Sequence, residues 1–175
     1  MPNWVIKMTA DHSLSEELRR EDKRAERRRE VRLAITEILA QAATVQEAAP
    51  SILGAICRGL GWDVGGFWLL SLQADSLHCL TVWQLPPARA PRFEAASRGR
   101  VFTPGVGLPG RVWSSRKPEW IADVVPDGNF PRAAVAAAEG LHGSFAFPLC
   151  SAASSSGSSS FSAVTSVSRT PTCWN

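Results

Sequence analysis

The feature that most constrains the fold of this chain is a run of charge near its beginning. Thirteen of the sixteen residues from Ser15 to Glu30 are charged, with both signs mixed. Because so many charged side chains cannot be buried in a hydrophobic core, this run predicts a solvated helix. The apolar residues that follow, from Val31 to Val45, recur with helical spacing and extend the same helix.

Apolar positions along this predicted helix follow an imperfect seven-residue repeat that strengthens toward the C-terminal end. One set of positions contains Leu18, Ala25, Arg32 and Leu39, and a companion set contains Leu14, Glu21, Arg28, Ile35 and Ala42. Such repeats are typical of parallel coiled coils. We therefore expect a homodimer through the N-terminal helix, and the alternative is a single helix surrounded by solvent.

Residues 44–149 have the pattern of a compact α+β domain. Thr44 followed by Glu47 is a capping box, which predicts a helix through Leu60 that Gly59 and Gly61 end. Strand-like apolar runs follow at 64–72, 77–85, 100–102, 119–125 and 144–149, with helical pieces at 93–97, 109–115 and 131–140. Their irregular spacing and short connections predict an antiparallel sheet with helices on one side.

A Ser-rich tail completes the chain. No Asp, Glu, Lys or Arg lies between Glu139 and Arg169, and ten of the eighteen residues from Ser151 to Ser168 are serine. This composition predicts a disordered segment. The expected organisation is thus an N-terminal linker and helix at 1–43, a domain at 44–149 and a tail at 150–175.

The glycines at 105, 107 and 110 match a dinucleotide-binding pattern letter for letter. The preceding apolar run is only three residues long, and Asp123 and Asp127 come too early to serve as the acidic residue of that motif. We interpret the segment as a tight turn that leads into a short helix, with Pro109 in its first turn.

The residues that usually carry catalysis or bind metals form no recognisable cluster. Four cysteines, Cys57, Cys79, Cys150 and Cys173, are widely spaced and indicate neither a zinc site nor a disulfide framework. His78 precedes Cys79 in a predicted strand, so the two side chains point to opposite faces; we expect an exposed histidine and a buried cysteine. The sequence therefore predicts no catalytic and no metal-binding residues.

Charge and hydropathy argue against two kinds of partner, nucleic acids and membranes. The formal net charge of +3 is spread along the chain, which argues against a nucleic-acid partner. No apolar run approaches the eighteen or so residues that a membrane span needs. We therefore expect a cytoplasmic protein that does not insert into membranes, which agrees with the absence of a disulfide framework.

The order of motifs resembles the GAF domains of bacterial signalling proteins, of the sensor histidine kinase type. The resemblance covers residues 35–149, and its most specific parts are PGVGLPGRVW, PEWIADV and the NFPRA helix. It implies a six-stranded antiparallel sheet flanked by helices and preceded by a signalling helix. A pocket over the sheet holds a small molecule in some members of this family.

The resemblance implies a sensory module of a two-component system, which binds a small molecule or partner and relays the signal through its flanking helices. It names no cofactor and implies no catalysis by this chain itself, whereas the parent protein would carry a histidine kinase or nucleotide cyclase. Seven residues match segments that wall the family's pocket: Trp83, Phe102, Val106, Leu108, Trp113, Ile121 and Asp123.

Two other functions stay open at this point. One is a small GAF-type enzyme such as a methionine sulfoxide reductase, for which Cys79 and Cys150 are the only candidate thiols. The other is a dimerisation fragment that binds no ligand.

The chain departs from the family after Leu149, where a final central strand and an exit helix are expected and the Ser-rich tail stands instead. We therefore expect the final strand to be missing, which would leave two open sheet edges and a weakened domain. Four residues, Phe161, Ala163, Val164 and Val167, offer only a poor substitute. In a reading frame shifted by one base, the codons of the tail would encode an apolar strand and the start of a helix. This leads to the hypothesis of a frameshift or sequencing error near codon 149.

Overall fold

The computed structural model describes residues 3–71, 73–86, 89–150 and 161–169. The elements in chain order are α1 (Asn3–Gln41), α2 (Val45–Leu60), β1 (Val64–Ser71), β2 (Ser76–Gln84), α3 (Pro91–Arg98), β3 (Val101–Phe102), α4 (Gly107–Ser115), β4 (Glu119–Ile121), α5 (Ala133–Ala138), β5 (Gly143–Cys150) and β6 (Phe161–Ser168). The six strands form one antiparallel sheet in the order β3-β2-β1-β6-β5-β4. The fold is α+β, as predicted.

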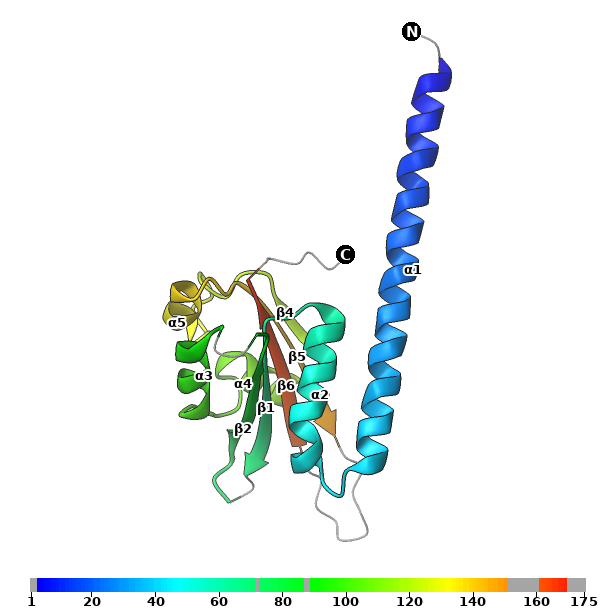
Figure 1. The fold of residues 1–175 in the computed structure, drawn as a ribbon. Helices are drawn as coiled ribbons and strands as arrows, with labels where there is room; N and C mark the ends of the chain where they lie inside the picture. The colour runs from blue at the N-terminus through cyan, green and yellow to red at the C-terminus, as the bar shows by residue number, and fades with distance from the viewer. Residues whose placement is uncertain (1–2, 72, 87–88, 151–160, 170–175) are drawn as a thin grey trace.

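Helices lie on both faces of this sheet (Figure 1). One face, here called the α2 face, is covered by α2, with α1 beyond it; the other, the α4 face, carries α3, α4 and α5. The prediction of helices on one side is therefore wrong. Its physical reason lies in the central strands, where Phe67 packs toward α2 while its neighbour Trp68 packs against Phe102 and Trp113 on the α4 face.

The long helix α1 packs on α2 only through its C-terminal part. Val31, Ile35, Ile38 and Ala42 lie against the cluster that α2 forms with the sheet. The rest of α1 runs past the domain (Figure 1). Leucines of α1 stay exposed to solvent, namely Leu18 (54%), Leu33 (59%) and Leu39 (47%).

The ends of α2 follow the predicted capping chemistry. Thr44 Oγ1 accepts a hydrogen bond from the Glu47 backbone N–H at 3.2 Å, and the Glu47 carboxylate accepts one from Ala43 N. Gly61, in the left-handed region with φ +74°, ends the helix and donates to Cys57 O. Gly59, by contrast, lies inside the helix rather than ending it, and it faces α1.

The expectation of a missing final strand is wrong, because residues 161–168 form β6 in the centre of the sheet. This strand pairs with β1 on one side and with β5 on the other, and each of its eight residues is buried. Backbone hydrogen bonds can hold a strand in a sheet whatever its side chains are. The apolar side chains of β6 also alternate between the two faces: Phe161, Ala163 and Val167 point to the α4 face, and Val164 points to the α2 face. The tail residues 151–160 and 170–175, including Cys173, lie outside the described residues.

Most polar side chains in and beside β6 are satisfied locally. Thr165 Oγ1 accepts a hydrogen bond from Trp68 Nε1 at 3.0 Å, and Ser144 Oγ donates to Ser166 O at 3.0 Å. The Ser166 hydroxyl is buried beside the Cys57 thiol and has no partner with good hydrogen-bond geometry among the described residues. Small hydroxyl side chains thus let a serine-rich segment occupy the centre of a sheet at modest cost.

The glycine-rich segment is the predicted turn into a short helix. Gly105 and Gly107 adopt φ values of +78° and +61°, and α4 begins at Gly107. Asn129 ties the turn to the neighbouring loop, since its Oδ1 accepts from Gly107 N and its Nδ2 donates to Gly105 O, both at 2.9 Å. This geometry excludes the dinucleotide-binding interpretation, because β3 before the turn and β4 after α4 lie at opposite edges of the sheet and not side by side as in a βαβ unit.

Candidate functional site

Four of the seven predicted pocket residues lie together on the α4 face of the sheet. Phe102, Leu108, Trp113 and Ile121 are all buried there, at 0 to 9% exposure. Leu108 and Ile121 belong to one core cluster, and Phe102 and Trp113 belong to another. Their side chains are packed as core, and their role in ligand binding stays a prediction.

The other three predicted residues lie elsewhere. Trp83 is on the α2 face, where the Arg58 guanidinium lies 5.4 Å from its ring centroid. Val106 is 42% exposed in the loop before α4. The Asp123 carboxylate lies 3.1 Å from His142 Nδ1. The pKa of Asp123 is below its ordinary value, mainly because the carboxylate accepts a hydrogen bond from the Val125 backbone N–H. The structure therefore does not bring the seven residues into one site.

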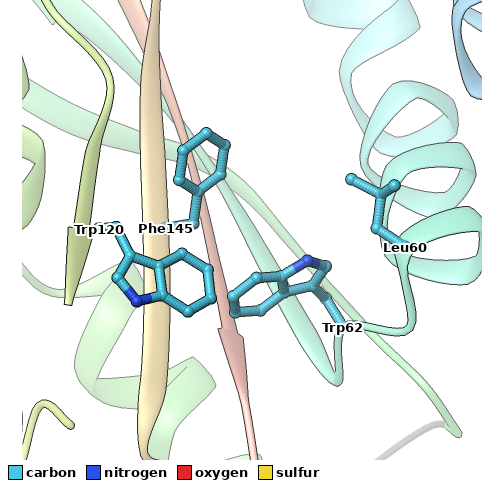
Figure 2. Close-up of a pocket in the computed structure, with 4 residues that line it drawn as sticks. All are labelled: Leu60, Trp62, Trp120 and Phe145. Atoms are coloured by element: carbon cyan, nitrogen blue, oxygen red, sulfur yellow. The ribbon is translucent and has the colours of Figure 1, made fainter. Parts of the chain in front are cut away.

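A cavity lies on the opposite, α2 face, between the end of α2 and the strands β4 and β5. It has a volume of about 290 Å³ and is lined by Leu60, Trp62, Trp120 and Phe145. Figure 2 shows the indole rings of Trp62 and Trp120 next to each other, with Phe145 beside Trp120 and Leu60 projecting from the last turn of α2. We call this feature the aromatic cavity.

The local sequence explains how the aromatic cavity forms. Trp120 and Phe145 are directly paired across β4 and β5, so both side chains stand on the same face. The left-handed turn at Gly61 then places Trp62 beside them, with its ring centroid 5.4 Å from that of Trp120 at an interplanar angle of 72°. This T-shaped contact is a favoured arrangement of aromatic rings.

Sequence reasoning missed this cavity. The aromatic residues are conspicuous in the sequence, but most of them are expected to be core. The signal that separates Trp120 and Phe145 from the others is their cross-strand register, which depends on the pairing of β4 with β5.

The two described cysteines with recorded side-chain surroundings, Cys57 and Cys79, are both shielded from solvent. Burial raises the pKa of the Cys57 thiol to about 12, against a smaller lowering by the Ser166 hydroxyl beside it. Burial also raises the pKa of Cys79. His78 is exposed, as predicted, whereas Cys79 is half-buried rather than buried. Within the part of the chain that the structure describes, no three His, Cys, Asp or Glu side chains are grouped to hold a metal.

Two arginines on the α4 side are shielded from solvent: Arg111 partly and Arg132 almost completely. Arg111 binds Asp127 at 2.7 Å and Glu119 at 3.2 Å, and so joins α4 to β4 and to the loop that contains Asp127. Arg132, at the start of α5, is 3% exposed, and burial lowers the pKa of its guanidinium to about 9. It lies among four aromatic rings rather than beside a carboxylate.

None of the helices in the described ranges has the length and apolar character that crossing a bilayer requires.

With this fold and these features in view, comparison with known proteins identifies the family. The family model of the GAF domain matches residues 42–155. The chain therefore belongs to the GAF domain family, which is a general sensory and regulatory fold. No curated protein matches it by sequence.

Known structures show the same fold at low identity. The GAF domain of a phosphoenolpyruvate-protein phosphotransferase from Coxiella burnetii is similar at 14% identity and a TM-score of 0.65, over 87% of this chain and 83% of that one. The free methionine-R-sulfoxide reductase of Neisseria meningitidis, in complex with its substrate, is similar at 17% identity and a TM-score of 0.61, over 85% and 76% of the two chains.

These neighbours correct one expectation. The sequence led to the expectation that the chain is not an enzyme, yet the fold is shared with reductases, including one from Staphylococcus aureus at 13% identity and a TM-score of 0.59, over 85% of this chain and 82% of that one. The GAF fold therefore does not by itself separate sensors from enzymes.

Proposed function

We propose that this GAF domain is the regulatory module of a signal-transduction protein of the two-component sensor-kinase type, in which occupation of the aromatic cavity is relayed through α2 to α1. One observation carries the proposal: of two consecutive residues at the end of α2, one faces the aromatic cavity and the other faces α1. Leu60 lines the cavity, and Gly59 lies against Val31 of α1.

The chemistry of the aromatic cavity favours a small apolar ligand or an apolar side chain of a partner protein. Its four lining residues carry no charge, and the polar atoms among them are indole N–H groups. Its volume of about 290 Å³ suits a molecule of one or two rings. Such a molecule would bury its surface against Trp62, Trp120 and Phe145 and add ring contacts to theirs.

The packing around α2 supports a relay toward α1. A Cβ on Gly65 of β1 would lie 2.8 Å from Cys57 Sγ, so α2 lies close on the sheet; a Cβ on Gly59 would lie 2.2 Å from Val31 Cγ2, so α1 lies close on α2. Interfaces packed this tightly transmit a displacement as a rigid-body shift. A ligand that moves Leu60 would therefore move Val31.

We also propose that α1 joins two copies of the chain, with the signal passing along the paired helices. Ile35 and Ala42 of the companion positions pack on α2, so the contact between copies would rest on the set that contains Leu18 and Leu39, which are exposed. Sedimentation of the full chain tests this point. Leu18→Ser with Leu39→Ser should give monomers, and Leu33→Ser, an exposed leucine outside the repeat, should stay dimeric; a monomeric wild type would contradict the proposal.

Ligand binding is tested with indole as the probe. Indole should raise the melting temperature of the wild-type chain with a saturable dependence on concentration, because it binds only the folded state. Trp120→Ala should weaken binding at least tenfold, and Trp83→Ala, a half-buried tryptophan on the same face but outside the cavity, should leave it unchanged. Absence of saturable binding would favour the dimerisation fragment without a ligand.

The reductase alternative makes different demands on the chain. A nucleophilic thiol needs a lowered pKa, whereas burial raises that of Cys79, and the side chain of Cys150 lies outside the described residues. Turnover of free methionine-R-sulfoxide with a thiol reductant measures this alternative. Activity that disappears in Cys79→Ser or Cys150→Ser would establish it.

A further inference from the structure

Three aromatic rings line the aromatic cavity at different inclinations (Figure 2). The planes of Trp62 and Trp120 are inclined at 72° with their centroids 5.4 Å apart, and the plane of Phe145 is tilted by 44° from that of Trp120 at 6.2 Å. Trp62 is 2% exposed, whereas Trp120 and Phe145 are half-buried, so the cavity opens to solvent beside β4 and β5. A small molecule in the cavity would therefore contact rings on more than one side.

The faces of aromatic rings carry partial negative charge and attract cations. Elsewhere on this domain the chain supplies such cations itself. Guanidinium groups lie over the rings of Trp83 at 5.4 Å, Phe161 at 4.5 Å and Phe93 at 4.5 Å, and they belong to Arg58, Arg116 and Arg132. Within the described ranges, no arginine or lysine lies over the rings that line the aromatic cavity. These rings thus adjoin space in which a cation from outside the chain could lie.

The hydrogen-bonding groups of the cavity walls select the kind of cation. The indole N–H groups of Trp62 and Trp120 are donors only, and the side chains of Leu60 and Phe145 have no polar atom. A primary ammonium has three N–H donors and would find no side-chain acceptor among these residues, which is costly. An ammonium whose hydrogens are all replaced by methyl groups has no donor to satisfy, and its surface is apolar. The walls therefore favour a fully methylated ammonium, the kind of cation that aromatic cages recognise.

We propose that the aromatic cavity binds a small molecule that carries a quaternary ammonium group. This inference rests on the proposed function, because it names the ligand class of the same cavity. The charged nitrogen would lie among the rings of Trp62, Trp120 and Phe145, with its methyl groups against them and against Leu60. The volume of about 290 Å³ lies near the lower end of the range for ligand pockets, as a compact head group requires.

Calorimetric titration of the full chain with choline tests the inference against two matched molecules. One is the uncharged alcohol in which carbon replaces the nitrogen of choline, and the other is ethanolamine, which has N–H groups in place of the methyl groups. At equal ionic strength, choline should bind saturably and at least fivefold more tightly than either. An alcohol that binds as tightly as choline would overturn the inference.

The indole titration separates this failure from failure of the proposed function. Binding of indole without binding of choline would overturn the quaternary ammonium and leave an apolar cavity. Absence of binding for both would overturn the proposed function as well. When both bind, choline should raise the concentration of indole needed for half-saturation, because they occupy one cavity. Independent binding of the two would contradict the assignment.

Substitutions of one tryptophan test the role of its ring. Trp120→Leu keeps an apolar wall without the ring, so choline affinity should fall at least tenfold and that of the uncharged alcohol less than threefold. Trp120→Phe keeps a ring and should stay within about threefold of the wild type. Trp83→Leu, on the same face but outside the cavity, should leave choline binding unchanged. Equal losses for choline and the alcohol in Trp120→Leu would contradict a cation–π contact.

Two controls complete the design. Phosphatidylcholine vesicles carry the same head group on a lipid, and they should not sediment with the chain. Binding to vesicles without binding to free choline would contradict a small-molecule ligand. If Trp120→Leu does not fold, the comparison of choline with the uncharged alcohol on the wild-type chain decides.

Discussion

Val31 of α1 lies so close to Gly59 of α2 that a Cβ at residue 59 would be 2.2 Å from Val31 Cγ2. Glycine is here needed for a close approach of two helices rather than to end a helix. The contact fixes α1 on α2 immediately beside Leu60, the residue through which α2 reaches the aromatic cavity.

Replacing Gly59 by alanine tests this contact. Alanine favours a helix interior by about 1 kcal/mol over glycine. The clash with Val31 should outweigh that gain, with a net loss of about 1–2 kcal/mol in the free energy of unfolding. Urea denaturation of Gly59→Ala measures this loss.

Two matched variants identify the cause. Val31→Ala combined with Gly59→Ala removes the clashing methyl groups and should recover most of the stability that Gly59→Ala loses. Gly128→Ala, where nothing lies within 4 Å of the added Cβ, should be neutral. A Gly59→Ala protein as stable as the wild type would show that α1 and α2 are not packed in this way in solution.

The central position of β6 predicts that Val164 carries stability. It is fully buried between the sheet and α2, so Val164→Ala should lower the free energy of unfolding by about 1–3 kcal/mol. Val125→Ala, at a valine that is 38% exposed, is the control and should cost less than 0.5 kcal/mol or so. Equal, small effects of the two substitutions would mean that the tail does not complete the sheet.

The hydroxyls of Ser166 and Ser144 should differ in their contributions. Among the described residues the Ser166 hydroxyl has only the Cys57 thiol beside it, a weak hydrogen-bonding group without good geometry, so Ser166→Ala should be neutral or stabilising by up to about 1 kcal/mol. Ser144→Ala removes a bond to Ser166 O and should cost about 1 kcal/mol. Differential scanning calorimetry of the two variants compares them, and the opposite order would contradict the hydrogen bonding described for this strand.

Acid should weaken the bridge between Arg111 and Asp127. Burial alone would raise the pKa of Asp127. Hydrogen bonds from Arg111 and from the Asn129 backbone N–H outweigh this effect, so the pKa of Asp127 is below its ordinary value. A carboxyl whose pKa is lowered by folding stabilises the protein above its unfolded-state pKa, near 4, and this stabilisation is lost as the pH falls through the folded-state pKa.

Asp127→Asn should therefore destabilise the chain at pH 7 by about 1 kcal/mol, and the difference from wild type should shrink as the pH falls below about 4. Denaturation with urea at a series of pH values measures it. In an Arg111→Met background the same substitution should have a much smaller effect at every pH. A difference that stays constant from pH 7 to pH 3 would show that Asp127 does not titrate as described.

Much of the fold could be predicted because local chemistry determines it. The Thr44 cap, the left-handed Gly61 and the turn at Gly105 and Gly107 depend on neighbours in the chain, and all are confirmed. The faces of the sheet and the fate of the tail could not be predicted in the same way. Whether Val164 is buried depends on β1 and β5, which are far away in sequence, and serine content indicates only a weak strand.

The candidate sites show the same division. The His142–Asp123 contact and the four aromatic rings around Arg132 join residues from separate elements, and no spacing in the sequence reveals them. The frameshift hypothesis and the domain boundaries stay predictions. The nucleotide sequence around codon 149 tests the former, because a coherent ending typical of the family must appear in the alternative frame.

Hydrogen exchange of α1 tests the relay most directly. With indole at saturating concentration, amides near the end of α2 and in α1 around Val31 should exchange more slowly than in the free chain, and both changes should disappear in Trp120→Ala. Protection confined to β4, β5 and Trp62, with unchanged exchange around Val31, would contradict the relay from the aromatic cavity to α1.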